Sequence, residues 1–111
     1  VTEITTKSGF YDYDNKYTDG GSTHICPAPL PKAKYDEVME MAVVAHNALG
    51  CRSLSRSDFR YDEKGDGKFY ILETNTQPGM TPLSLSPELA AHAGIPFNEL
   101  VAKILASARL D

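Results

Sequence analysis

The alternation of hydrophobic and polar residues predicts three strands along this chain. Residues 1–6 alternate β-branched and polar side chains, which is typical of a strand. Two more strand-like runs, 51–61 and 68–75, flank the polar, glycine-containing residues 62–67, which predict a hairpin turn. We therefore expect these two runs to pair as neighbouring strands.

The strand predicted over residues 68–75 is partly apolar on both faces. Such a strand is expected inside a sheet rather than at its edge. A regular period of two divides its side chains between the faces: Phe69, Ile71 and Glu73 alternate with Tyr70, Leu72 and Thr74.

A helical period follows at Pro31, a residue that the first turn of a helix tolerates. The apolar stripe at this spacing consists of Tyr35, Val38, Ala42, Ala45 and Leu49. Gly50 is expected to end the helix. Further along, Ser86 and Pro87 predict the N-cap and first position of a short helix ending at Gly94.

The last predicted helix begins at about Pro96 and carries Leu100, Ile104 and Ala108 on one face. Two loops remain, 7–30 and 76–85. The first is long, rich in Gly, Pro, Tyr and Asp, and lacks a helical period, and long loops in compact domains are commonly functional or disordered. Because it contains several aromatic residues, we interpret it as a lid that closes over a ligand.

The composition narrows the possible functions. The 111 residues are 41% hydrophobic and 23% charged, as in an ordinary globular domain, and the net charge of −4 disfavours a nucleic-acid partner. The sequence has no apolar run of about 20 residues and no recognisable secretory signal, so no membrane association is expected. Cys26 and Cys51 lack CxxC spacing and are expected to be buried free thiols. The chain begins as a strand already under way and without an initiating Met, which an expression boundary, a proteolytic fragment or missing upstream sequence would each explain.

Three oxygen-bearing side chains are expected to converge on the predicted hairpin. Glu73 and Asn75 are two residues apart and share a face, and pairing of the strands can place Asp58 opposite them. A hard cation such as Mg²⁺ binds such oxygens together with nucleotide phosphates. The alternative is a solvated sheet face on which Arg or Lys side chains offset the carboxylates.

Arg56 precedes Asp58 by two residues and shares its face. Its guanidinium is suited to clamping a phosphoryl group and stabilising charge that develops during transfer. The alternative is that Arg56 only pairs with the neighbouring carboxylates. Arg60 has the same parity and is a weaker candidate for the same role.

The two loops contain further candidates. Lys16 in the lid could reach a terminal phosphate when the lid closes, although an exposed loop lysine is commoner. Gly79 could direct backbone N–H groups at an oxyanion, and Ser84 could hydrogen-bond a carboxylate, with a plain turn and an ordinary serine as alternatives. His24, His46 and His92 do not cluster at ligand spacing. The sequence has no P-loop and no G-x-S-x-G elbow.

Several motifs together resemble one family. They are Phe10 to Tyr17, Cys26-Pro27-Ala28, Leu49 to Arg52, Arg56 to Phe59, and Leu72 to Leu85 with its Glu-x-Asn-Thr-x-Pro-Gly-Met-Thr run. In these motifs the chain resembles the C-terminal part of bacterial D-alanine–D-alanine ligase. The resemblance implies an α+β fold, the C-terminal lobe of an ATP-grasp domain, with a mainly antiparallel sheet and flanking helices over residues 1–111.

The resemblance also implies a reaction and a set of roles. ATP would phosphorylate one D-alanine carboxylate, and a second D-alanine amine would attack the acyl phosphate, as a step of peptidoglycan synthesis. Mg²⁺ or Mn²⁺ would be bound by Asp58, Glu73 and Asn75. Arg56 would stabilise the transferring phosphoryl group. Implied contacts to the substrates involve the following residues: Lys16 to the terminal phosphate, Phe10 and Leu72 to adenine, Gly79 to the oxyanion, and Ser84 with Leu85 to the second D-alanine carboxylate.

Tyr17 matches the lid tyrosine that the family associates with dipeptide rather than D-lactate ligation. The family's N-terminal and central domains have no counterpart in this sequence, so the isolated chain is expected to be inactive and to need those domains as partners. The resemblance further implies a cytoplasmic location and a possible homodimer. Two alternatives stay open: another ATP-grasp carboxylate–amine ligase, and a non-catalytic module that binds a divalent ion or a protein.

Overall fold

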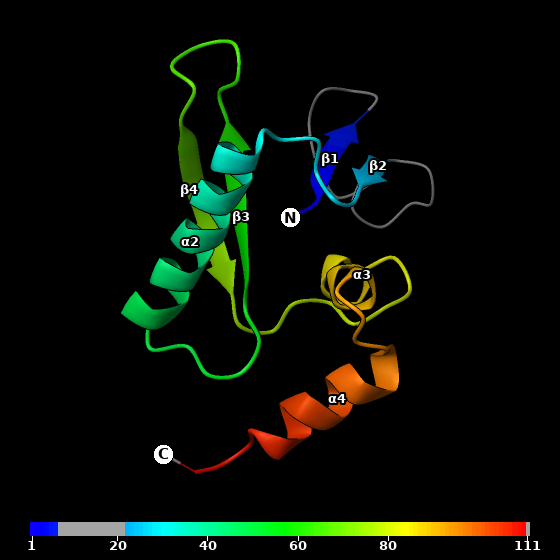
Figure 1. The fold of residues 1–111 in the computed structure, drawn as a ribbon. Helices are drawn as coiled ribbons and strands as arrows, with labels where there is room; N and C mark the ends of the chain where they lie inside the picture. The colour runs from blue at the N-terminus through cyan, green and yellow to red at the C-terminus, as the bar shows by residue number, and fades with distance from the viewer. Residues whose placement is uncertain (7–21, 111) are drawn as a thin grey trace.

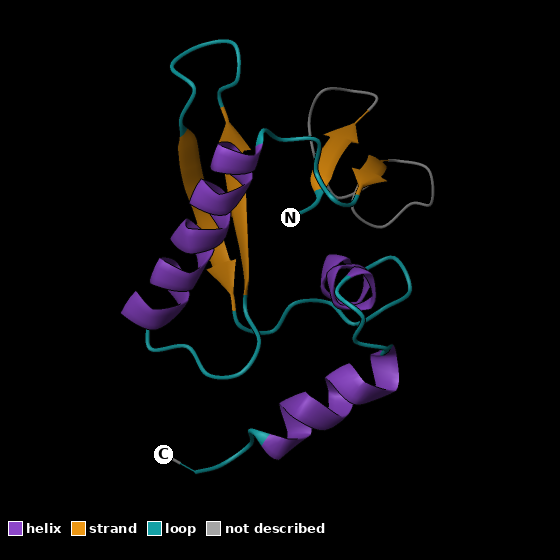
Figure 2. Ribbon diagram, viewed as in Figure 1, coloured by secondary structure: helices purple, strands orange, loops and turns teal. Residues whose placement is uncertain are grey.

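The computed structural model describes residues 1–6 and 22–110 of the chain (Figure 1). Two small antiparallel sheets and three helices make up this part, which confirms the α+β prediction (Figure 2). The elements are β1 Glu3–Thr6, β2 Ser22–Ile25, α2 Lys32–Ala48, β3 Arg56–Tyr61, β4 Phe69–Asn75, α3 Leu85–His92 and α4 Phe97–Ala106.

The first sheet joins β1 to β2, with Ile4 opposite His24. The predicted first strand is thereby confirmed, but the prediction of a continuous loop over 7–30 was wrong at Ser22–Ile25. This segment contains Thr23 and Ile25, β-branched residues that favour extended backbone, and β1 offers it an antiparallel partner. The predicted lid residues Phe10, Lys16 and Tyr17 lie outside the described residues.

Helix α2 packs against the β3–β4 hairpin (Figures 1 and 2). It follows Pro31 and ends before Gly50, whose φ of +64° is a left-handed conformation that glycine adopts without steric cost, so both predicted ends are confirmed. Of the predicted stripe, Val38 is buried, whereas Leu49 is exposed because it lies at the C-cap beyond the sheet.

The strand predicted from residue 51 begins only at Arg56. Residues 51–55 are irregular, and Ser53 has a φ of +66°, which is incompatible with a strand. From Arg56 onward the hairpin forms as predicted, with Arg56 opposite Asn75 and Asp58 opposite Glu73. The turn closes through Asp62, whose backbone N–H donates to the Lys68 carbonyl at 3.0 Å.

A β-bulge interrupts the hairpin next to Asp58. Asp58 pairs with Glu73, but Phe59 pairs with Ile71, so Leu72 is an extra residue on β4. Since Asp58 and Phe59 point to opposite faces of β3, their partners Glu73 and Ile71 do so too. The predicted alternation, which put Ile71 and Glu73 on one face, was therefore wrong. The sequence pattern assumed an unbroken period of two, and the bulge shifts that period by one residue.

The prediction that β4 lies inside a sheet was also wrong for the described part of the chain, where β3 is its only pairing partner. Tyr70, Ile71 and Leu72 are 49%, 47% and 66% exposed. The interior position was predicted because both faces of this strand carry apolar side chains. Within residues 1–6 and 22–110 these side chains remain largely exposed.

Helix α3 begins at Leu85 with Ser84 as its N-cap residue, two residues earlier than predicted. Pro87 is then the third helical residue, still within the first turn, where backbone N–H groups have no intrahelical acceptor and proline is tolerated. Gly94, at φ +84°, follows the end of the helix as expected. Helix α4 ends at Ala106, so Ala108 lies beyond the predicted apolar face.

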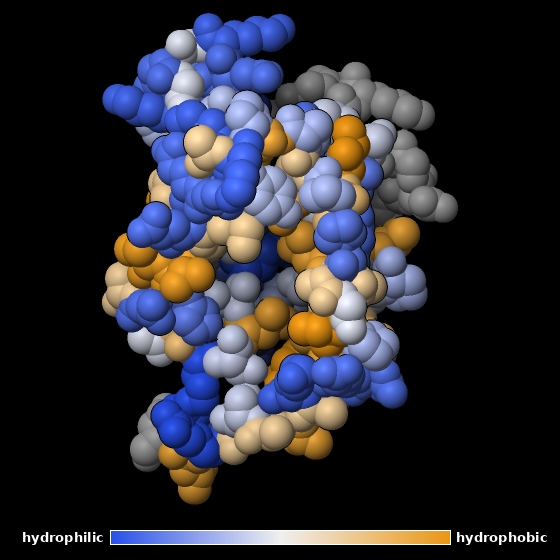
Figure 3. All heavy atoms as spheres, viewed as in Figure 1, coloured by the Kyte–Doolittle hydropathy of each residue, from blue (hydrophilic) through white to orange (hydrophobic). Residues whose placement is uncertain are grey.

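The hydrophobic core of the described chain is small. Four apolar residues are buried, Ala28, Val38, Leu85 and Leu100, and no described side chain is less than 2% exposed. Large apolar side chains that are more than half exposed include Val43, Val44, Leu49, Leu72, Phe97 and Leu105. Figure 3 shows hydrophobic atoms at the surface over α2 and a hydrophilic cap over the hairpin turn. A domain of this size ordinarily buries more of its apolar surface.

Candidate functional site

The polar face of the β3–β4 hairpin is organised by Arg56. Its Nε lies 2.8 Å from Asp58 Oδ1 and its Nη2 lies 3.0 Å from Asp58 Oδ2, which is a bidentate arrangement. Nη2 also lies 3.6 Å from Glu73 Oε1. Both carboxylates thus lie close to one guanidinium, as expected from strand pairing, and Arg56 does pair with them in this structure.

Solvent access differs among these groups. The Arg56 side chain is 19% exposed, that of Asp58 30%, and that of Glu73 56%. The more buried guanidinium is fixed by the bidentate contact, while the Glu73 carboxylate remains open on its outer side. The site can therefore accept a ligand that arrives from solvent at Glu73.

Asn75 completes the predicted set of oxygen donors. It pairs with Arg56 across the hairpin, and its side-chain Oδ1 accepts a hydrogen bond of 2.8 Å from the Gln77 backbone N–H. An amide oxygen has two lone pairs, so this turn contact leaves one for another partner. The same contact orients the start of the loop that leads to Gly79.

The donor chemistry of this face fits a hard cation. Mg²⁺ commonly takes one or two protein carboxylates and completes its shell with water and phosphate oxygens. Asp58 and Glu73 supply two carboxylates, and the contacts of both with the Arg56 guanidinium show that the position favours positive charge. No cluster of three His, Cys, Asp or Glu side chains suited to a metal occurs among the described residues, so a cation here would depend on Asn75 or on a ligand.

Two other candidate residues of the hairpin, Leu72 and Arg60, lie outside the cluster of Arg56, Asp58 and Glu73. Leu72 is the bulged residue next to Glu73 and is 66% exposed, so its side chain is available to a ligand. Arg60 pairs with Tyr70 two positions beyond Asp58 and is exposed. Of the two arginines considered, Arg56 is the one that contacts the carboxylates of the candidate site.

Gly79 and Ser84 lie against each other in the loop between β4 and α3. A Cβ atom at Gly79 would lie 2.7 Å from Ser84 Oγ, closer than a real Cβ contact allows. Ser84 Oγ is fixed there, because it accepts a hydrogen bond of 2.9 Å from the Thr81 N–H and lies 2.8 Å from Thr81 Oγ1. A side chain at position 79 would therefore force Ser84 Oγ out of its contacts with Thr81, which gives glycine a steric advantage there besides the predicted role of its N–H.

Leu85 and Ser86 begin helix α3 and are buried, at 7% and 5% exposure. The Leu85 side chain is therefore a packing group, and any contact of this residue with a ligand would come from its backbone. Its N–H belongs to the first helical turn, whose N–H groups have no intrahelical acceptor and attract anions. Ser84 and the start of α3 thus offer a hydroxyl and backbone N–H groups that suit a carboxylate.

Sequence reasoning missed two histidine contacts. His24 Nδ1 lies 2.8 Å from Glu88 Oε2, joining β2 to α3, and His46 Nδ1 lies 2.7 Å from Ser55 Oγ, joining the end of α2 to the residue before Arg56. The residues of the first pair are 64 positions apart, so no local spacing could have indicated it. The second connects the helix to the strand that carries the arginine.

The clear pKa shifts lie away from this site. The pKa of Lys34 is raised, chiefly by its hydrogen bond to Glu37, and the pKa of Tyr70 is raised, chiefly by its hydrogen bond to Asp66. Lys34 and Glu37 are on α2, and Asp66 is in the hairpin turn. The candidate site is consequently identified by geometry and donor type.

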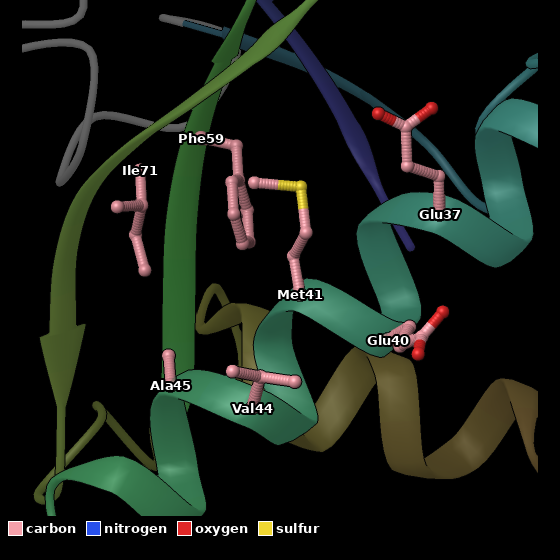
Figure 4. Close-up of a pocket in the computed structure, with 7 residues that line it drawn as sticks. All are labelled: Glu37, Glu40, Met41, Val44, Ala45, Phe59 and Ile71. Carbon is pink, nitrogen blue, oxygen red and sulfur yellow. The ribbon is translucent and has the colours of Figure 1, made fainter.

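The opposite face of the hairpin forms an apolar groove with α2. Its volume is about 370 Å³, and its lining residues are Glu37, Glu40, Met41, Val44, Ala45, Phe59 and Ile71 (Figure 4). The Met41 side chain points toward the Phe59 ring, whereas the two carboxylates point away from it. The groove has no polar group suited to catalysis at its centre and differs in kind from the Arg56 face.

Comparison with known proteins gives a consistent result. The family model described as D-ala D-ala ligase C-terminus matches residues 1–106. The D-alanine–D-alanine ligase of Caulobacter vibrioides is 57% identical over 108 residues, which are 97% of this chain and 33% of that protein. The ligase of Paramagnetospirillum magneticum is 54% identical over 100% of this chain and 37% of its own length.

Solved structures agree with the sequence matches. The crystal structure of D-alanine–D-alanine ligase from Bacillus anthracis complexed with ATP is similar with a TM-score of 0.75 and 32% identity. That similarity covers 96% of this chain and 34% of the other. The chain thus spans about a third of the length of the relatives it matches. In the described part of the chain, every helix is too short or too polar to cross a bilayer.

Proposed function

The chain belongs to the family of D-alanine–D-alanine ligase C-terminal domains. We propose that it supplies residues that bind the metal and the nucleotide, and the site for the acceptor amino acid, in an ATP-dependent ligase. The reaction would join two D-alanines through an acyl phosphate for peptidoglycan synthesis in the cytoplasm. Since the chain spans about a third of its relatives, the proposed activity requires the remaining N-terminal and central domains of such an enzyme.

The observation that carries this proposal is the pairing of Asp58 with Glu73 around the Arg56 guanidinium. Two carboxylates and one guanidinium provide attachment for both a cation and an anion at one place. That combination suits a metal-bound nucleotide, whose phosphates need positive charge and whose metal needs oxygen ligands.

Asp58, Glu73 and Asn75 would hold Mg²⁺, which when bound neutralises phosphate charge. Arg56 would exchange one contact with a carboxylate for a contact with the phosphoryl oxygens and stabilise their negative charge during transfer. The exposed Leu72 side chain, next to Glu73, would pack against the adenine. The roles of Phe10 at the adenine, Lys16 at the terminal phosphate and Tyr17 in the lid stay predictions, because these residues lie outside the described part.

On the acceptor side, Ser84 would bind the carboxylate of the second D-alanine together with the backbone of Leu85. The hydroxyl is already oriented by Thr81, so little ordering is needed on binding. The Gly79 N–H would stabilise the oxyanion of the tetrahedral intermediate. The close approach of Gly79 to Ser84 brings these two functions together.

A chimaera tests the proposal. The first two thirds of the Caulobacter vibrioides relative, joined to this chain, should release ADP from ATP only in the presence of D-alanine, and should form the dipeptide. Replacing the second D-alanine with D-lactate should give far less product; comparable product with D-lactate would favour the related ligase. The 111-residue chain alone should form none, and a folded chimaera without turnover would reject the proposal.

The acceptor site has its own test. Gly79→Ala would clash with Ser84 Oγ and should destabilise the chimaera by about 1–2 kcal/mol and raise the KM for D-alanine. Ser84→Ala removes the atom at 2.7 Å and leaves the nearest contact at 3.5 Å. The double variant should therefore be more stable than Gly79→Ala alone; strictly additive losses would contradict the steric account.

A further inference from the structure

His24 and Glu88 connect two parts of the chain through one short contact. The His24 imidazole Nδ1–H donates to Glu88 Oε2 at 2.8 Å, and the two side chains are 21% and 35% exposed. His24 lies on β2, opposite Ile4, while Glu88 is in the first turn of α3. In Figure 1 the paired strands β1 and β2 lie above this helix.

Glu88 lies close to the proposed carboxylate site. It follows Leu85 by three residues and Ser84 by four, and residues so spaced lie on one side of a helix. The contact with His24 therefore holds the side of the first turn that Ser84 begins. Ser84 is itself fixed to Thr81, so the orientation of α3 and the position of the Ser84 hydroxyl depend on each other.

Charge gives His24 a second effect. A carboxylate in the first turn of a helix interacts favourably with the helix dipole. However, a substrate carboxylate at Ser84 would be repelled by Glu88 one turn away. A hydrogen bond from the imidazole takes up part of the Glu88 charge and reduces this repulsion.

We propose that His24 is a positioning residue for the acceptor amino acid: through Glu88 it orients the first turn of α3 and keeps that end of the helix receptive to a substrate carboxylate. This inference rests on the proposed function and deepens it. His24 would not contact the substrate, and its effect would be confined to the carboxylate-binding step.

Kinetics of the chimaera test this role. His24→Leu should raise the KM for the second D-alanine about three- to fivefold, the range for a partly exposed ion pair. The kcat and the KM for ATP should change by less than about twofold, because uniform binding is lost rather than transition-state stabilisation. His24→Gln, which retains an N–H donor, should recover part of the loss.

Double variants separate charge from folding. Adding Glu88→Gln to His24→Leu removes the repelling charge and should recover the part of the KM rise that comes from repulsion, while the part that comes from lost orientation remains. Asp36→Asn is the matched control, since Asp36 pairs with Lys32 on an exposed face of α2 and should leave the KM unchanged. An equal fall in kcat and rise in KM, or no recovery in the double variant, would overturn the proposal.

A second measurement decides the matter independently of ligase activity. In the 111-residue chain, His24→Leu should accelerate amide hydrogen exchange in β2 and in residues 89–92 of α3, whose N–H groups have intrahelical acceptors, about three- to fivefold, with α4 unchanged. Unchanged exchange in both segments would overturn the positioning role even if the chimaera is active. If the chimaera has no turnover but exchange responds, the proposed function fails and the structural coupling stands.

Discussion

The two faces of the β3–β4 hairpin differ in how far their side chains find partners among the described residues. On the polar face, Arg56 pairs with Asp58 and approaches Glu73, so the half-buried guanidinium has partners close by. On the apolar face, α2 covers Phe59 and Ile71 only in part and leaves an open groove (Figure 4). The site is therefore organised locally, while much of the apolar surface is not.

This difference follows from the range of the interactions. A bidentate ion pair between residues two apart on one strand needs only that strand and its neighbour. Burial of apolar surface requires elements that cover it, and among the described residues only those of α2, β3 and β4 line the groove. The polar face should hence tolerate changes to packing better than the apolar face does.

The largest expected effect is on the polar face. Asp58→Asn or Glu73→Gln in the chimaera should lower kcat by about 10²–10³-fold, since each removes a charge proposed to act on the metal–phosphate group. The free energy of unfolding, measured with denaturant, should change little for Glu73→Gln because that side chain is 56% exposed. Unchanged turnover in both variants would favour the non-catalytic module instead.

Two single-residue deletions in β4 test the strand register that the bulge sets. Deletion of Leu72 removes the unpaired residue and leaves Glu73 opposite Asp58 and Ile71 opposite Phe59. Turnover should be retained, with the KM for ATP raised about tenfold by loss of a packing side chain. Deletion of Thr74 shortens β4 equally but moves Glu73 opposite Ser57, on the wrong face, and should abolish turnover. Equal activity of the two deletions would contradict the register argument.

The register also shows what could be predicted from the sequence. The hairpin, the convergence of Arg56, Asp58 and Glu73, and the helix from Pro31 to Gly50 all follow from short-range patterns. The bulge does not, because Leu72 fits a strand as well as its neighbours do and only the pairing with β3 makes it extra. Strand β2 was missed since its partner β1 lies across residues 7–21 of the chain.

The same reasoning applies to the remaining differences. The start of α3 was placed at Ser86 because proline is common at the first helical position, yet the first turn accepts it at the third as well. The His24–Glu88 contact joins residues 64 apart and depends on how β2 and α3 are placed in space. Long-range placement, rather than local propensity, accounts for what the sequence left open.

A smaller effect is expected on the apolar face. Phe59→Ala should lower the free energy of unfolding by about 2 kcal/mol, less than a fully buried phenylalanine would, since Phe59 is only half-buried. It also removes an edge-to-face contact with Phe69, whose ring centroid is 6.4 Å away. Val43→Ala is the control, because Val43 is 59% exposed and should cost well under about 1 kcal/mol by the same denaturant measurement. An equal decrease in the free energy of unfolding for both variants would show that packing of Phe59 in the groove adds no stability beyond that of an exposed side chain.

The smallest effect concerns Tyr70, which pairs with Arg60 beyond the bulge and donates a hydrogen bond to Asp66 in the turn. That bond raises the pKa of Tyr70, because it favours the neutral phenol next to a carboxylate. A tyrosine pKa above its unfolded value stabilises the fold below the unfolded pKa, and this contribution is lost as the pH rises through the folded pKa, in the alkaline range. Asp66→Asn should lower the pKa of Tyr70, observed by NMR titration of its ring. An unchanged pKa of Tyr70 in this variant would contradict the account, because the hydrogen bond to Asp66 is the largest cause of the shift.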